Sequence, residues 1–276
     1  MLGHVRLGAQ RWISIGSFAF QPSEFIKLSL ILVLSHYVGI RRDSMRELKS
    51  LAIPCVLLGI PFVLVLLQPD LGTALLLIPV FLSIMYIGGA PVKYLLSMVA
   101  AGIAAMPFFW HVLRDYQKQR LLVFLNPNID PLGSGYTIIQ SKIAIGSGGI
   151  LGKGWLSGTQ NQLNFLPERH TDFIFAVVGE EWGFFGAGLL ILAYFVIVNR
   201  AFIIAALTGD MYGKAVATGI AVLLSSQVLI NIGMTLGMMP VVGIPLPLVS
   251  YGGSSLIATF IAVGLLVNIG IRRSRF

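Results

Sequence analysis

Charged side chains are scarce in this sequence. Of its 276 residues, 11% are Asp, Glu, Lys or Arg and 56% are hydrophobic, and its mean hydropathy is +0.87. A soluble domain carries roughly 25% charged residues. A deficit of this size excludes an ordinary water-soluble globular protein, because most of the surface must be apolar. The composition therefore predicts a membrane protein whose outer surface faces lipid.

The sequence lacks the residues that several classes of protein function need. The single cysteine, Cys55, excludes an intrachain disulfide and a cysteine-based metal site. Walker, Rossmann and zincin motifs are absent from the sequence. The net charge of +8 does not indicate nucleic acid as a partner, because the basic residues form no stripe interleaved with aromatics. They cluster between and after apolar segments, as the topology signals of a membrane protein do.

Long apolar segments dominate what is present. A spanning helix takes roughly 20 apolar residues, and a backbone in lipid must satisfy its own hydrogen bonds, which favours helices over open strands. The sequence predicts an all-α, polytopic integral membrane protein with about seven spanning helices. They are expected near residues 24–40, 51–67, 71–87, 92–111, 173–198, 213–236 and 249–271.

Short basic loops predict the orientation of these helices. Basic residues gather in residues 41–49, between the first two helices, and in residues 272–276 at the end of the chain. Cytoplasmic loops carry the excess of Lys and Arg, so both segments are expected inside. Residues 1–23 and the large loop 113–172 are then expected outside. The large loop has basic residues of its own, but the positive-inside rule weakens for long loops.

The 113–172 loop is too long for a plain connection. Structureless loops of this length are rare in compact proteins and are usually functional. Its middle, residues 136–145, is amphipathic enough for a short helix at the membrane interface. Glycine-rich backbone with interspersed lysines resembles a phosphate cradle, and a plain surface loop is the alternative interpretation.

A first polar group lies in residues 21–27, with the sequence QPSEFIK. Pro22 suits the start of a helix, and Glu24 suits its positive dipole end. Glu24 and Lys27 are three residues apart, so they share a helix face and can pair. Two interpretations are open: a salt bridge that neutralises both charges, or a charged group that faces a polar cavity.

A second polar group, residues 167–172 with the sequence PERHTD, leads directly into an apolar helix. Asp172 would stand at the outer N-terminus of that helix. Asp is a preferred N-cap, worth about 1 kcal/mol, so the spacing suits a cap as well as a catalytic carboxylate. Glu180 and Glu181 fall about two turns deeper in the predicted helix. One of them is expected to face the bundle interior, because lipid exposure is costly.

A third group, residues 240–255, cannot form one regular helix. Pro240, Pro245 and Pro247 fall within it, and glycines follow closely. Irregular backbone at membrane depth is tolerated only where protein or a cavity covers it. The connection between the last two helices is therefore expected to be a structured segment rather than a simple turn.

Three separated motifs resemble the SEDS family of bacterial membrane proteins. The second motif is more similar to the RodA elongation branch than to the FtsW division branch, and the likeness covers the chain from Gly8 onward. The resemblance implies a single transmembrane domain over residues 1–276 that lacks about three of the family's ten spanning helices, each of roughly 20 residues. The motifs are residues 8–13 with 21–24 and Lys27, residues 160–175, and Asn231 with residues 237–255.

The resemblance implies a peptidoglycan glycosyltransferase that polymerises lipid II at the outer face of the cytoplasmic membrane during cell elongation and so maintains rod shape. A sugar hydroxyl would attack an anomeric carbon, and undecaprenyl pyrophosphate would leave. A carboxylate can take the hydroxyl proton. Basic side chains or a divalent cation, Mg or Mn, can stabilise the developing pyrophosphate charge.

Carried over residue by residue, the likeness assigns the catalytic carboxylate to Asp172. Trp12, Glu24 and Lys27 match cavity positions of the family. Expected partners are lipid II and lipid-linked glycan, a class B penicillin-binding protein and other membrane proteins of the elongation complex. A lipid II flippase and a scaffold without activity are the alternative functions. The other residues expected at the substrate site are Lys142, Lys153, Glu168, Arg169, His170, Ser250, Gly252 and Gly253.

Overall fold

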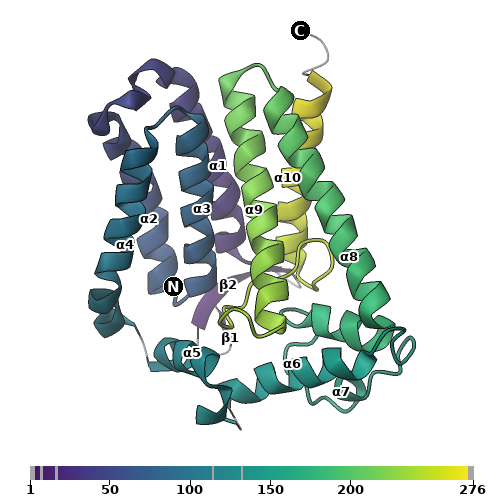
Figure 1. The fold of residues 1–276 in the computed structure, drawn as a ribbon. Helices are drawn as coiled ribbons and strands as arrows, with labels where there is room; N and C mark the ends of the chain where they lie inside the picture. The colour runs from purple at the N-terminus through teal and green to yellow at the C-terminus, as the bar shows by residue number, and fades with distance from the viewer. Residues whose placement is uncertain (1–3, 7–8, 16–17, 114, 132, 273–276) are drawn as a thin grey trace. The chain divides into compact units, whose positions relative to one another are not determined.

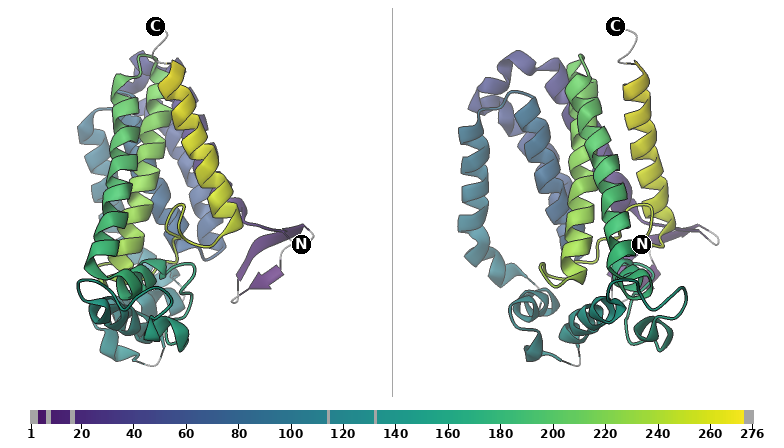
Figure 2. Two further views of the ribbon diagram at one scale, coloured as in Figure 1. Left: turned by 90° about the vertical axis from the view of Figure 1, so that its right-hand side faces the viewer. Right: turned by 45° about the vertical axis from the view of Figure 1, so that its right-hand side comes forward.

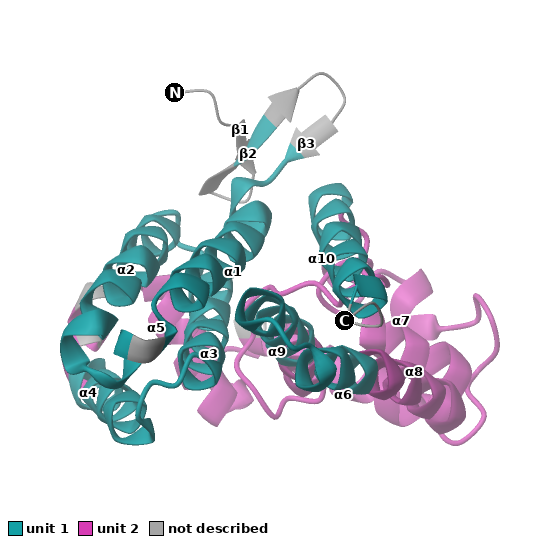
Figure 3. Ribbon diagram, turned by 90° about the horizontal axis from the view of Figure 1, so that it is seen from above, with its two compact units in different colours: residues 1–106, 198–226, 253–276 teal, residues 107–197, 227–252 magenta. Residues whose placement is uncertain are grey.

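The fold is taken from a computed structural model in which residues 4–6, 9–15, 18–113, 115–131 and 133–272 are described. They form two compact units, 1–106 with 198–226 and 253–276, and 107–197 with 227–252 (Figure 3). The early helices are α1 (Pro22–Ile40), η1 (Arg42–Arg46), η2 (Leu48–Leu51), α2 (Ala52–Leu67), α3 (Leu71–Ile87) and α4 (Val92–Val112). The later ones are α5 (Asp115–Leu125), η3 (Pro127–Ile129), α6 (Ser134–Gly148), α7 (Thr159–Gln162), α8 (Ile174–Leu207), α9 (Met211–Thr235) and α10 (Gly253–Arg272) (Figure 1).

Helices long and apolar enough to cross a membrane are α1, the segment Leu48–Leu67, α8, α9 and α10. Two shorter apolar helices are Leu71–Ile87 and Val92–Phe108. Each of them coincides with a predicted span, so the predicted all-α polytopic architecture is confirmed. The largest difference in bounds is at α8, which continues to Leu207 rather than ending near Val198.

In the first unit, α1 packs against α2, α3 and α10. Ile31 of α1, Ile84 of α3 and Ile220 of α9 are almost completely buried in one core cluster. The close approach depends on Gly219, where an added Cβ would come within 2.9 Å of both Ile31 and Ile84. Small residues at helix interfaces are favoured in lipid, because association there relies on close packing rather than on a hydrophobic driving force.

A tight turn at residues 68–70 joins α2 to α3. Asp70 stands at the N-cap of α3 and is buried. Its carboxylate accepts hydrogen bonds from the Thr73 N–H at 3.1 Å and the Thr73 hydroxyl at 3.0 Å. The side chain thereby satisfies one of the donors that every helix start leaves unpaired.

Three short strands precede α1 and were not predicted. β1 (His4–Arg6), β2 (Ala9–Ile15) and β3 (Phe18–Phe20) form an antiparallel sheet in that order (Figure 2). Ile13 pairs with Phe20, and Trp12 pairs with His4. The segment lies ahead of the first span, where the rule that excludes open strands from lipid does not apply. β2 contacts α1, and β3 contacts α10.

In the second unit, most of the predicted 113–172 loop is folded. It contains α5, η3, α6 and α7, and α6 packs against the other three. The short helix predicted at residues 136–145 is confirmed within α6. Ala144, Leu166, Phe173 and Ala176 form a small buried cluster in this unit. Most of the long connection is therefore folded into helices rather than being an irregular loop.

α8 is interrupted close to its start. Gly183 has φ 64° and ψ −158°, which is not helical, and this left-handed region favours glycine. A Cβ at this position would lie 2.7 Å from the Ile150 carbonyl oxygen. Glu180 and Glu181 therefore precede the break, in a short piece ahead of the long apolar part of α8. The helical periodicity of the sequence did not reveal this separation.

Candidate active site

Asp172 lies in the turn just before α8. The main-chain carbonyl of Glu168 accepts hydrogen bonds from the N–H groups of residues 171–173 at 3.1–3.3 Å. Glu168 itself has φ 51°, an uncommon conformation for a residue with a side chain. Strained residues of this kind persist only where the surrounding structure holds them, and they cluster at functional sites.

The turn is held from the third motif by Ser250 and Tyr251. The Tyr251 N–H donates to the His170 carbonyl at 2.8 Å. The Ser250 hydroxyl donates to the Thr171 carbonyl and accepts from the Leu246 N–H at 2.8 Å. Ser250 is buried, so these hydrogen bonds are shielded from water. The second and third motifs therefore meet directly.

The next carbonyl of the turn is held by Asn231 of α9. The Asn231 side-chain amide donates to the Asp172 carbonyl at 2.9 Å and to the Ile244 carbonyl at 2.8 Å. Asn231 is completely buried. Together with the two bonds above, this fixes three successive carbonyls, those of residues 170–172.

The Asp172 carboxylate lies beside Gly243. A Cβ added to Gly243 would come within 3.2 Å of Asp172 Oδ2, and Gly243 has φ 68°. A glycine at this position therefore leaves room next to a carboxylate that is partly buried. α8 begins at Ile174, but helix bounds vary by one or two residues between assignments. The geometry is thus compatible with the cap and with the catalytic interpretation.

Arg169 and His170 lie in the same turn. Arg169 Nε donates to His170 Nε2 at 3.1 Å, and a second Arg169 nitrogen donates to the Asn161 carbonyl. The Glu168 carboxylate accepts from the Thr171 hydroxyl at 3.1 Å. The structure thus brings three further predicted site residues into one polar turn with Asp172.

Two basic side chains lie against the loop that follows α9. A Cβ on Gly237, which has φ 69°, would come within 2.6 Å of Lys142 Nζ. Arg120 donates to the Val241 carbonyl at 3.3 Å. Both side chains are exposed, and the same loop carries Gly243. Cationic groups in this position are suited to an anionic substrate group.

Lys153 lies in a different environment from the other predicted site residues. Its ammonium group forms an ion pair with Glu180 at 2.8 Å, and the Glu180 side chain is 1% exposed. The Glu180 carboxylate also accepts from the Thr159 hydroxyl at 3.2 Å and from the N–H groups of Gln160 and Asn161 at 3.0 and 3.3 Å. Both carboxylate oxygens are therefore engaged, and Lys153 helps to hold the loop in place.

Glu181 extends this attachment. Its carboxylate accepts from the Leu156 N–H and from the Asn161 amide, both at 3.2 Å. The main-chain carbonyls of Glu180 and Glu181 accept from the N–H groups of residues 153 and 154 at 3.0 Å. We name this arrangement, residues 180–181 bound to residues 153–161, the acidic clamp.

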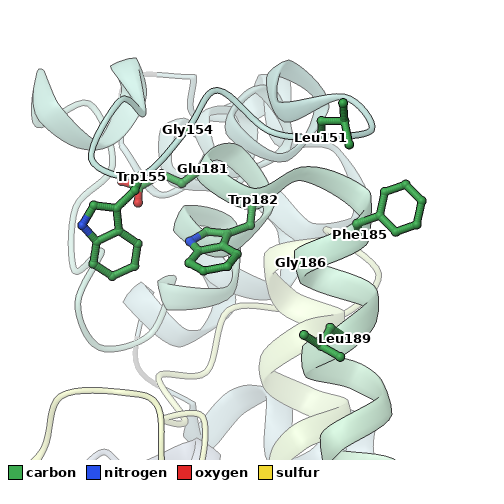
Figure 4. A pocket seen from close by; sticks show the side chains of 8 residues that line it. All are labelled: Leu151, Gly154, Trp155, Glu181, Trp182, Phe185, Gly186 and Leu189. Carbon is green, nitrogen blue, oxygen red and sulfur yellow. The ribbon is translucent and has the colours of Figure 1, made fainter.

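An apolar cavity of about 560 Å³ adjoins the acidic clamp. Trp155 and Trp182 meet edge to face in it, with ring centroids 5.7 Å apart. Asp172 does not line this cavity. The lining residues are Leu151, Gly154, Trp155, Glu181, Trp182, Phe185, Gly186 and Leu189 (Figure 4).

The first unit holds the remaining predicted residues. Lys27 and Glu24 form an ion pair at 2.7 Å, with side chains only 3% and 5% exposed, so the predicted pairing is confirmed. The Gln21 N–H donates to the Ser254 hydroxyl at 3.0 Å, next to Gly253 at the start of α10. Trp12 lies in β2 and is partly buried.

Sequence reasoning missed the contact between Asn231 and Asp172. Asn231 was recognised only as a motif residue, because no spacing rule connects positions 59 residues apart. Within the part of the chain that the structure describes, no group of three or more His, Cys, Asp or Glu residues could hold a metal ion. A divalent cation was the alternative to basic side chains, and Mg²⁺ commonly binds one or two carboxylates together with phosphate oxygens of a substrate.

Residues 1–275 match the family described as "Cell cycle protein", which comprises FtsW, RodA and SpoVE. This chain belongs to that family. The predicted resemblance to SEDS proteins is thereby confirmed. Family membership and the apolar helices together identify the chain as a multi-pass protein of the bacterial cytoplasmic membrane.

Relatives of the FtsW, RodA and SpoVE family match almost the whole chain. Peptidoglycan glycosyltransferase MrdB of Escherichia coli (strain K12) is 46% identical over 272 residues, which are 98% of this chain and 73% of MrdB. Stage V sporulation protein E of Bacillus subtilis (strain 168) is 40% identical and covers 100% of this chain and 75% of its own length. Peptidoglycan glycosyltransferase RodA of Treponema pallidum (strain Nichols) is 34% identical, with coverages of 99% and 79%.

Solved structures of the family share the fold. A chain from the work titled "Structural coordination of polymerization and crosslinking by a peptidoglycan synthase complex" superposes with a TM-score of 0.82 at 37% identity. The match covers 99% of this chain and 76% of that one. The rod shape determining protein RodA of Thermus thermophilus has a TM-score of 0.70 at 31% identity, with coverages of 99% and 72%.

Proposed function

We propose that this chain is a peptidoglycan glycosyltransferase that polymerises lipid II, with Asp172 as the general base. The relatives named for glycosyltransferase activity, MrdB and RodA, support the reaction class. The observation that supports Asp172 is the anchoring of its turn, in which the carbonyls of residues 170–172 each accept a hydrogen bond from the third motif or from α9.

In the proposed reaction, a sugar hydroxyl of one lipid-linked molecule attacks the anomeric carbon of another. A new glycosidic C–O bond forms, and the bond between that carbon and the pyrophosphate oxygen breaks. The hydroxyl proton passes to the Asp172 carboxylate, and undecaprenyl pyrophosphate leaves with the electron pair of the broken bond. General-base catalysis of this kind contributes roughly 10²- to 10⁴-fold in rate.

Fixing the backbone matters because a general base must lie within hydrogen-bonding distance of the proton that it takes. An error of about 1 Å in position can cost on the order of 10²-fold in rate. The bonds to the turn therefore limit how far Asp172 can shift. Lys142 and Arg120, which lie against the loop that carries Gly243, and Arg169 of the turn are the cations that we assign to the pyrophosphate charge.

The proposed reaction takes place at the outer face of the membrane. The basic segments 41–49 and 272–276 support this orientation, because they place residues 113–172 on the opposite side. Single cysteines at Asn128 and Glu47, in a Cys55→Ser background, test it with an impermeant thiol reagent. Labelling at Asn128 and protection at Glu47 in intact cells is expected, and the reverse pattern contradicts the orientation.

The proposed partner is a class B penicillin-binding protein that cross-links the new strands. The basis is the structural neighbour, whose title describes the coordination of polymerization and crosslinking in a peptidoglycan synthase complex. A polymerase that works beside a transpeptidase delivers uncross-linked glycan directly to it.

Asp172→Asn is the experiment that tests the proposed function. Asn caps helices about as well as Asp, so the melting temperature and lipid II binding are expected to survive. Glycan polymer from purified protein and lipid II, resolved on a gel, is expected to fall by about 10²- to 10⁴-fold. Polymer within a few-fold of wild type from a well-folded Asn variant would return Asp172 to the role of a helix cap.

The alternative functions give different results in the same preparation. A flippase would move labelled lipid II across a vesicle bilayer without forming glycan, whatever stands at position 172. A scaffold would do neither and would still co-purify with its transpeptidase. Absence of polymer from the wild-type protein together with lipid II translocation would replace the proposed reaction with transport.

A further inference from the structure

Asn231 has an unusual set of hydrogen bonds for a completely buried side chain. Its Nδ2 group donates to two main-chain carbonyls, those of Asp172 and Ile244. Its Oδ1 atom is buried and has no hydrogen-bond partner among the residues that the structure describes. The alternative amide orientation would direct Oδ1 at the two carbonyl oxygens, which are acceptors only. The two carbonyls therefore determine which way the amide points.

A buried acceptor without a partner is unfavourable, and such groups are rare in native proteins. Leucine would remove the unpaired oxygen, but it would leave the carbonyls of Asp172 and Ile244 without this donor. Asparagine therefore leaves one acceptor unpaired and supplies two donors at one point. This pattern is typical of a residue that serves the site rather than the packing of α9.

The two acceptors of Asn231 belong to separate segments of the chain. One is the carbonyl of Asp172 itself, and the other belongs to Ile244, the residue after Gly243. Gly243 is the residue whose added Cβ would come within 3.2 Å of Asp172 Oδ2. A single amide group therefore couples the turn that carries the carboxylate to the loop that lies beside that carboxylate.

We infer that Asn231 is a positioning residue, which sets the place of Asp172 relative to the loop around Gly243. This inference rests on the proposed role of Asp172 as the general base. Asn231 touches no reacting atom in this account and acts only through the main chain of Asp172. Without it, the turn keeps the bonds from Ser250 and Tyr251 but loses its tether to Ile244.

The test compares Asn231→Leu with Thr235→Val in purified full-length protein. Thr235 is the matched control, because it lies one turn further along α9, is equally buried, and donates its hydroxyl only to Ile232 of its own helix at 2.8 Å. The expected result for Asn231→Leu is a kcat per folded molecule that falls about 10- to 100-fold, while KM for lipid II stays close to that of the control.

A double variant separates positioning from a general structural effect. Asp172→Asn combined with Asn231→Leu is expected to polymerise no more slowly than Asp172→Asn alone, because residues that act as a unit are not additive. A loss that multiplies in the double variant would overturn the inference, as would a folded Asn231→Leu with wild-type kcat. If Asn231→Leu fails to fold, Asn231→Ser, which keeps one short donor, is subjected to the same two criteria.

These outcomes are distinct from a failure of the proposed function. Polymerisation by Asp172→Asn at the wild-type rate would remove the general base, and this inference with it. A slow Asp172→Asn beside a normal Asn231→Leu would leave the general base in place and refute only the positioning role.

Discussion

Asp172 and Glu180 flank the first turns of α8, and the protein bonds them in different ways. The hydrogen bonds that hold the Asp172 turn are made to main-chain carbonyls, from Asn231, Ser250 and Tyr251. At Glu180 the carboxylate itself is the acceptor, for Lys153 and for three groups of residues 159–161. At Asp172, these bonds fix the main chain that carries the carboxylate. At Glu180, the carboxylate itself holds residues 153–161 in place.

The difference separates two uses of a carboxylate at a membrane protein site. A carboxylate that serves as the buried anchor of several donors stabilises the fold, and removing it leaves those donors without a partner. A carboxylate that acts as a base needs a fixed position and room for a substrate beside it. Gly243 lets the neighbouring loop approach the Asp172 carboxylate closely, whereas Glu180 is buried within the acidic clamp.

The largest loss of stability is expected from Glu180→Gln. Lys153 is exposed and Glu180 is buried, so the loss arises mainly from the buried hydrogen bonds to residues 159–161, and each buried group that loses its partner costs about 1–3 kcal/mol. The melting temperature in detergent should fall clearly, while the polymerisation rate per folded molecule stays within a few-fold of wild type. Glu168→Gln, at an exposed carboxylate in the turn, serves as the stability control. An unchanged melting temperature for Glu180→Gln would contradict the anchoring role.

The buried pair in α1 extends the comparison to a third carboxylate. Lys27→Met leaves Glu24 buried without its partner and is expected to cost about 3 kcal/mol. Replacing both residues, as Glu24→Gln with Lys27→Met, should recover most of that loss, because a buried pair is often no more stable than its neutral replacement. Recovery of both stability and polymer formation would identify the pair as structural, and recovery of stability alone would support the predicted cavity role.

A smaller loss of stability is expected from a change at Gly152, the residue just before the acidic clamp. Gly152 has φ 80°, and a Cβ there would come within 2.7 Å of the Gly183 nitrogen. Gly152→Ala should therefore cost about 1–3 kcal/mol through backbone strain. Gly146→Ala is the matched control, because no described atom outside its own stretch of helix lies within 4 Å of its Cβ position, and alanine favours a helix by about 0.5–1 kcal/mol over glycine. Equal melting temperatures for the two variants would refute the need for glycine at position 152.

Sequence periodicity was sufficient for the spanning helices, because length and apolar composition are what a bilayer selects. The irregular segment after Pro240 was also predictable, because the effect of proline and glycine on the backbone is local. The pair Glu24–Lys27 followed from a three-residue spacing on one helix. Features that arise from neighbouring residues were therefore predictable.

Contacts between distant segments were not predictable in this way. The break at Gly183 depends on backbone packing against residues 150–152, which no local pattern indicates. Lys153 was placed at the substrate site by resemblance, and its partner Glu180 became apparent only from the fold. Asn231 differs again: its motif was recognised, but its two carbonyl partners come from separate loops.

The central claim is that Asp172 takes part in the reaction, whereas Glu180 stabilises the fold. The direct test is to measure, side by side, the melting temperature and the polymerisation rate per folded molecule for Asp172→Asn and Glu180→Gln, two matched carboxylate-to-amide changes. The account predicts a rate loss of about 10²- to 10⁴-fold with little thermal effect at position 172, and a large thermal effect with little loss of rate at position 180. The opposite pattern, or the same pattern at both positions, would contradict it.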